Sequence, residues 1–175
     1  MIFEESCAWV EAAQTLWGLP CLLGVWTERE FDPEVDPRQD TKNVLVTTEL
    51  MDKNLLGIAH LPNGKAVPCG MAVSPSDDWL AFFLPLAGLE LAYEVGAFPW
   101  GDGNRPWIAE LNDWLAEIGK KVFCQAPFKI AAVGFEIQVS TVFDIDLSKA
   151  IELPQHRQCG LLVPAGQDAR GYPSA

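Results

Sequence analysis

The histidines and one cysteine are the residues of this chain whose types could support catalysis. His60 lies beside an Asn-Gly pair and His156 lies in the sequence PQHRQ, and neither has the HxH or HExxH spacing that holds a metal. Cys159 follows His156 and Arg157 closely, and basic neighbours lower the pKa of a thiol, but the sequence identifies no base to activate it. The chain also lacks a GxSxG elbow, a P-loop and a complete dinucleotide-binding glycine pattern. The sequence therefore assigns no catalytic residue and favours a protein that is not an enzyme.

Two pairs of acids have spacings that would suit a cation or a proton transfer. Asp144 and Asp146 alternate on one face of an expected strand, where carboxylates bind hard cations, but two ligands are too few for a site. Glu90 and Glu94 would form an acid/base pair if their segment is helical. A solvated face is the favoured explanation of both pairs. We therefore predict no metal site and no cofactor.

An aromatic loop is the better candidate for a binding site. The sequence FPWGDGNRPW leads into an expected helix and is rich in Trp, Phe and Arg, the types that dominate interface hot spots. An aromatic pocket above a helix N-terminus would also suit a small anionic or planar ligand. We predict that the binding residues of this loop are Phe98, Trp100, Asp102 and Arg105. Trp107 has helical spacing and is expected in the core.

The net charge of the chain limits the classes of partner that it is expected to bind. The formal net charge is −12, and an acidic, Pro-containing segment spans residues 28–40. No cluster of Lys or Arg is available for nucleic-acid phosphates or an anionic membrane, so neither is expected as a partner. A basic protein would be attracted and steered by the negative surface. The acids that we expect to steer it are Glu28, Glu30, Asp32, Glu34 and Asp36.

Length and composition predict one globular domain. The chain has 175 residues, of which 49% are hydrophobic and 21% charged. Its five Cys are scattered without a CxxC pair, so we expect free thiols. The longest apolar run, 79–89, is too short to span a bilayer, and the N-terminal segment carries acids where a signal peptide needs positive charge. We therefore expect a cytoplasmic protein, with residues 1–163 as the domain and residues 164–175 as a flexible tail.

Hydrophobic periodicity and turn signals predict an α+β fold. An N-terminal helix is expected over 3–17, and a major amphipathic helix over 105–122, with an apolar stripe that ends at Val122. The expected strands are 21–26, 43–49, 55–61 and 65–73 joined by an Asn-Gly turn, 79–86, 128–139, 142–147 and an edge strand at 158–163. We predict a single domain with a mainly antiparallel, curved sheet and helices on one face.

Two main functional hypotheses follow. The first is a small acidic binding protein, an inhibitor or partner of a basic protein, of the physical type of bacterial immunity proteins. The second is an α+β domain with an aromatic-lined pocket for a small molecule, enzymatic or not. A third is a structural subunit of a homo-oligomer with a sheet edge or aromatic patch as its interface.

Overall fold

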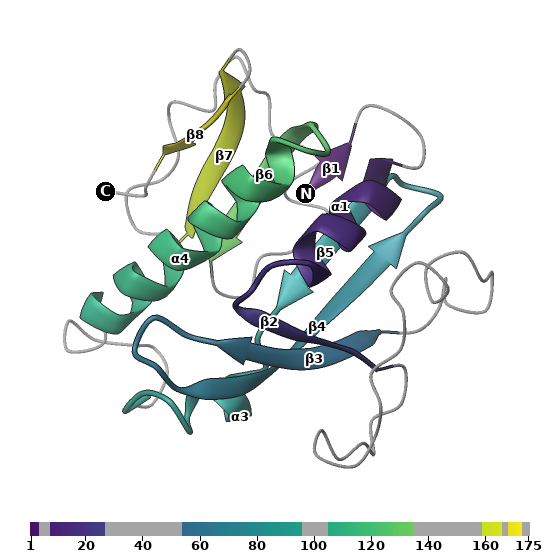
Figure 1. Cartoon of the computed structure of the whole chain (residues 1–175). Coiled ribbons are helices and arrows are strands. Elements are labelled where there is room, and N and C mark those ends of the chain that lie inside the picture. Colours follow the sequence, from purple (N-terminus) through teal and green to yellow (C-terminus); the bar gives the residue numbers. More distant parts are fainter. Residues whose placement is uncertain (4–7, 27–53, 96–104, 135–158, 166–167, 173–175) are drawn as a thin grey trace.

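Helices and an antiparallel sheet make up the fold, which confirms the predicted α+β class (Figure 1). The computed structural model describes residues 1–3, 8–26, 54–95, 105–134, 159–165 and 168–172. In this part of the chain the sheet has the strand order β2-β3-β4-β5-β1-β6-β7-β8. The strands are β1 (Ile2–Phe3), β2 (Leu22–Trp26), β3 (Leu55–His60), β4 (Ala66–Ser74), β5 (Trp79–Phe83), β6 (Phe128–Gly134), β7 (Cys159–Ala165) and β8 (Asp168–Tyr172). The helices are α1 (Ala8–Trp17), α3 (Leu86–Leu89) and α4 (Arg105–Phe123).

The first half of the sheet is a meander of β2 to β5 in sequence order. The predicted hairpin is confirmed: β3 and β4 pair with Leu55 opposite Met71 and His60 opposite Ala66. The turn between them uses Gly64 at φ +80°, a left-handed conformation that glycine adopts without strain. Alternate residues of these strands are buried, because one face of the sheet packs against the helices.

Helices α1 and α4 lie side by side on one face of the sheet (Figure 1). Their buried side chains join those of the sheet in one core, which is closed by the aromatic residues Phe3, Phe123 and Phe128. The short helix α3 lies on the opposite face, where its Gly88 approaches Pro68 of β4. A Cβ on Gly88 would stand 3.1 Å from the Pro68 ring, so the glycine allows this close approach.

The two-residue strand β1 joins the two halves of the sheet. Ile2 lies opposite Trp79 of β5 on one side and Ile130 of β6 on the other, and Phe3 lies opposite Phe128. The backbone N–H of Phe3 donates to the Asp78 carbonyl at 2.9 Å. This pairing corrects the predicted helix 3–17, because Phe3 belongs to a strand and the described helix begins at Ala8. Phe3 matches the helical spacing, but pairing on both sides buries it to 2% exposure.

Other element boundaries also differ from the prediction. Strand β5 ends at Phe83 rather than 86, because Pro85 precedes the turn of α3. Within β5 only Leu80 is fully buried, because only one face of this strand meets the core. Strand β6 is described to Gly134. The remainder of 128–139 and the expected strands 43–49 and 142–147 lie outside the described residues.

The C-terminal part contains one more strand than expected. Strand β7 confirms the strand predicted at 158–163, but it pairs with β8 and is therefore not the edge. Strand β8 lies within the range 164–175, for which a tail is expected. The helix predicted over 105–122 is confirmed as α4.

Candidate functional site

Most of the predicted binding residues lie outside the part that the structure describes. This holds for Phe98, Trp100 and Asp102, and for the five acids of the segment 28–40. Arg105 is the first residue of α4. The structure does show what lies on either side of the aromatic loop, namely the end of α3 before it and the first turns of α4 after it.

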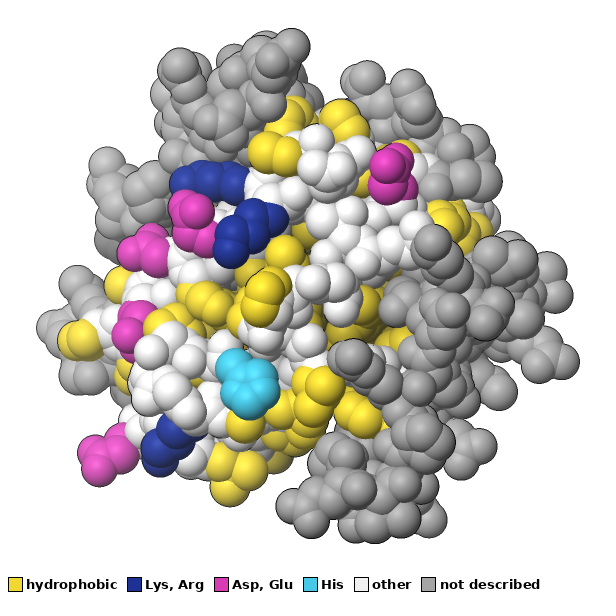
Figure 2. Space-filling view, in the orientation of Figure 1, with side chains coloured by type: hydrophobic (Ala, Val, Ile, Leu, Met, Phe, Trp, Pro, Cys, Tyr) yellow, Lys and Arg dark blue, Asp and Glu magenta, His cyan; other side chains and the backbone are white. Residues whose placement is uncertain are grey.

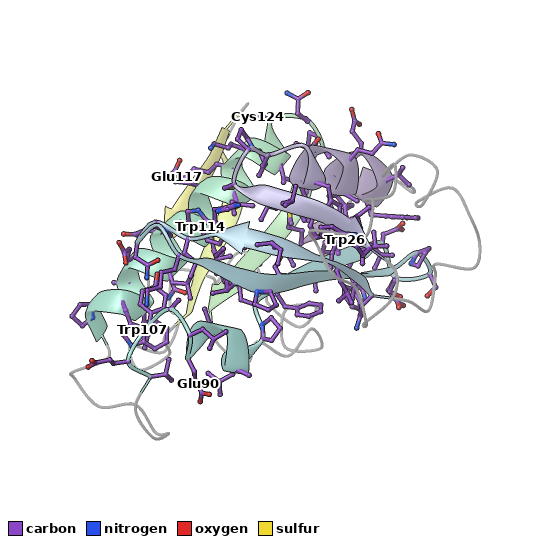
Figure 3. The ribbon with its side chains drawn as sticks, turned by 60° about the horizontal axis from the view of Figure 1, so that its bottom comes forward. Trp26, Glu90, Trp107, Trp114, Glu117 and Cys124 are labelled. Atoms are coloured by element: carbon purple, nitrogen blue, oxygen red, sulfur yellow. The ribbon has the colours of Figure 1, made fainter. Side chains whose placement is uncertain are left out.

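A stacked aromatic pair connects these two flanks. The rings of Tyr93 and Trp107 lie 5.1 Å apart between centroids with an angle of 22° between their planes. Tyr93 is placed by the turn that follows α3, where its backbone N–H donates to the Leu89 carbonyl at 2.8 Å. Trp107 lies in the first turn of α4 (Figure 3). Sequence reasoning missed Tyr93, which carries no periodic signal and meets Trp107 only in the folded chain.

The aliphatic residues of the apolar stripe of α4 are buried, including Leu111 near its N-terminal end, and its two Trp are half-buried. Ile118 and Val122 are buried, whereas Trp107 and Trp114 pack against the core with part of their rings exposed. Trp114 contacts Phe82 of β5, with 6.5 Å between the ring centroids. The expectation that Trp107 packs in the core is therefore confirmed in part, because its ring also reaches the surface.

The hairpin turn between β3 and β4 holds the α3 segment in place. The Asn63 side-chain amide donates to the Ala92 carbonyl at 3.2 Å, and the Lys65 ammonium donates to the Leu91 carbonyl at 3.3 Å. The Leu91 and Ala92 carbonyls lie in the turns after α3, so these two bonds satisfy carbonyls outside the helix. These two hydrogen bonds hold the backbone of residues 91–92, which directly precede Tyr93.

Exposed acids and leucines lie on the two segments that carry the aromatic pair, the α3 segment and the start of α4. Glu90, Glu94 and Glu110 are exposed, and Leu91 and Leu86 are 69% and 41% exposed. We call the residues Leu86, Glu90, Leu91, Glu94, Tyr93, Trp107 and Glu110 the acidic–aromatic surface. Figure 3 shows Glu90 and Trp107 toward the same end of the molecule. On the face drawn in Figure 2, most acidic side chains lie along one side, beside hydrophobic side chains.

The Tyr93 hydroxyl is the most unusual polar group of this surface. Burial raises the pKa of the Tyr93 phenol, and the neighbouring Glu110 carboxylate raises it further. The oxygen is buried, and the Glu110 carboxylate lies near enough to act on it through its charge and a side-chain hydrogen bond.

The other candidate groups have structural roles or lie apart. Asp77 accepts hydrogen bonds from the hydroxyls of Ser74 at 2.6 Å and Ser76 at 3.2 Å, so it closes the turn between β4 and β5. His60 is exposed at the end of β3. Glu90 lies beyond the end of α3, so the i, i+4 helical pair with Glu94 is not formed.

No group of three or more His, Cys, Asp or Glu is arranged to hold a metal within the described residues. Asp144, Asp146 and His156 lie outside them, and Cys159 begins β7. The cysteines whose side chains are described are free, as expected: Cys21, Cys69 and Cys124. None of the helices in the described ranges is long and apolar enough to cross a membrane.

Comparison of the chain with models of protein families, with curated proteins and with solved structures gives no match.

Proposed function

We propose that this protein binds a basic protein partner through the acidic–aromatic surface. The observation that carries the proposal is the stacked pair of half-buried rings of Tyr93 and Trp107, with exposed leucines and carboxylates on the two segments that carry the pair. Partly exposed aromatic side chains on a rigid helix supply the anchoring contacts of many interfaces. The carboxylates determine which partners are accepted, because a basic surface complements them and an acidic one is repelled.

The net charge of −12 supports the same partner. A strongly negative molecule attracts basic proteins over a distance of about 8–10 Å at ordinary salt, which raises the association rate. We assign this steering to the acids of the segment 28–40, and the anchoring to the acidic–aromatic surface, extended by Phe98 and Trp100. Within the proposal, the protein is one domain with a curved sheet and acts in the cytoplasm.

The test distinguishes the effect of the acids on the proposed surface from the effect of the overall negative charge. The triple variant Glu90→Lys, Glu94→Lys, Glu110→Lys reverses the acids of the surface. The matched control carries Glu11→Lys, Asp113→Lys and Glu117→Lys, which reverse three exposed acids outside this surface and change the net charge equally. The partner is captured from the host with wild-type protein, purified, and measured by surface plasmon resonance at low and high salt.

We expect the triple variant to bind at least about tenfold more weakly, a loss of about 1.4 kcal/mol, with a shallower salt dependence. The control should change the affinity by about twofold or less. Equal affinities and salt slopes for the wild type and the triple variant would contradict the proposal.

A further inference from the structure

The arrangement of Tyr93, Trp107 and Glu110 narrows the chemistry of the partner. Trp107 and Glu110 are three residues apart on α4, so they lie on neighbouring positions of one helix face. Tyr93 stacks on Trp107 from the other side of the loop. Glu110 is exposed, and it makes no salt bridge within the described residues. The Glu110 carboxylate also acts on the Tyr93 hydroxyl, so an aromatic surface and an exposed carboxylate lie side by side.

This combination suits one side chain better than others. A guanidinium group is planar, so it stacks on an aromatic face, and its N–H groups form a fork that pairs with a carboxylate. An ammonium group is compact and strongly hydrated, so it gains less from stacking. Phosphate or carboxylate ligands are disfavoured by Glu90, Glu94 and Glu110.

We infer that the acidic–aromatic surface receives an arginine side chain of the partner, stacked beside the Tyr93–Trp107 pair and paired with Glu110. This inference rests on the proposed function, because it names the anchoring residue of the basic partner. Lys65 does not occupy the position, because its ammonium donates to the Leu91 carbonyl.

The experiment uses the full chain and three small probes: capped arginine amide, capped lysine amide and capped citrulline amide. Citrulline has the shape of arginine without its charge. Binding is followed by NMR through the indole N–H signals, with the Trp107 signal assigned by the variant Trp107→Phe. Arginine should shift the Trp107 signal and bind at least about threefold more tightly than lysine, and citrulline should bind most weakly.

Two variants test the roles of the individual groups. Glu110→Gln should weaken arginine binding by about threefold or more while leaving citrulline binding unchanged. Trp114→Phe is the matched control, since Trp114 is also half-buried on α4 but contacts Phe82. It should leave arginine binding unchanged. Circular dichroism confirms that each variant is folded.

The inference is overturned if arginine and lysine bind equally, if Glu110→Gln has no effect, or if arginine shifts other Trp signals and not that of Trp107. Its failure differs from failure of the proposed function. If only the inference fails, the triple charge reversal still weakens binding of the basic partner. If the proposed function fails, the partner binds the triple variant as tightly as the wild type.

Discussion

At the scale of single residues, the core depends on glycines against which aromatic rings pack closely. Gly24 and Gly57 lie opposite each other on β2 and β3, and the Trp17 ring lies over both. A Cβ on Gly57 would stand 2.5 Å from the Trp17 ring and 2.7 Å from the Leu23 carbonyl oxygen. No side chain fits there unless the strands or α1 move. These glycines therefore set the distance between α1 and the sheet.

Cys69 gives a prediction about pH at the same scale. Burial raises the pKa of the Cys69 thiol from about 9 to about 12, with a smaller contribution from Cys21. In the unfolded chain the thiol ionises near its ordinary pKa, whereas in the folded chain it stays protonated. Between these two values the unfolded state binds fewer protons, so the free energy of unfolding falls as pH rises, by up to about 1.4 kcal/mol per pH unit.

The measurement is urea unfolding at about pH 8 and about pH 10 for the wild type and Cys69→Ala. From about pH 8 to about pH 10, the free energy of unfolding should fall by roughly 1 kcal/mol more in the wild type than in the variant, because the variant lacks the thiol. Iodoacetamide should label the exposed Cys124 in the folded protein and Cys69 only after unfolding. Rapid labelling of Cys69 in the native protein would contradict this prediction. So would an equal fall in the free energy of unfolding of the two proteins between the two pH values.

At the scale of elements, the β3–β4 turn supports the α3 segment as well as its own hairpin. The Asn63 side chain accepts from the Lys65 backbone N–H at 3.1 Å and donates to the Ala92 carbonyl at 3.2 Å. The substitution Asn63→Asp keeps the acceptor and removes the donor. We expect it to lower the free energy of unfolding by about 1 kcal/mol, and to loosen the Tyr93–Trp107 stack.

Urea unfolding measures the stability, and near-ultraviolet circular dichroism reports on the stacked pair. Asn54→Asp is the control, since it adds the same charge at an exposed position. It should change the stability by less than about 0.5 kcal/mol. If Asn63→Asp behaves like this control in both measurements, the turn does not hold the α3 segment.

Elements with strong local signals could be predicted from the sequence, and those made by tertiary pairing could not. The helix α4 and the β3–β4 hairpin have periodic side chains, a Pro near the helix start and an Asn-Gly turn. Strand β1 has two residues and no pattern of its own, because its partners on β5 and β6 define it. Helix α3 is a single turn, too short for a periodic signal.

The same reason limited the prediction of the site. The aromatic and acidic residue types around the loop indicated a binding region, and Arg105 and Trp107 do lie at the start of α4. The contact of Tyr93 with Trp107 depends on the turn after α3 and on its attachment to Asn63 and Lys65. Such a contact follows from tertiary structure and leaves no trace in local spacing.

At the scale of the whole molecule, β1 determines whether the two halves of the sheet act together. The buried Phe3 ring meets Phe128 edge to face, with 6.5 Å between centroids and an angle of 82°. Phe3→Ala removes this contact and leaves a cavity at the junction. We expect the free energy of unfolding to fall by about 3–5 kcal/mol.

Urea unfolding gives the value, with Leu91→Ala as the control. Leu91 is 69% exposed, so its truncation should change the stability by less than about 0.5 kcal/mol. Hydrogen exchange should show faster opening of the β5 and β6 amides in Phe3→Ala. A loss below about 1 kcal/mol would mean that helix packing alone holds the halves together.

The position of β1 also affects how the chain folds during synthesis. Residues 2–3 leave the ribosome before the other strands of the described sheet, yet their partner Phe128 lies far later in the chain. The meander of β2 to β5 contains its own sequential pairings and is complete long before β6 appears. The earliest strand of the described sheet is therefore among the last to reach its full set of neighbours. Until then, the β5 edge that β1 and β6 complete is a site where a nascent chain would need protection from wrong pairing.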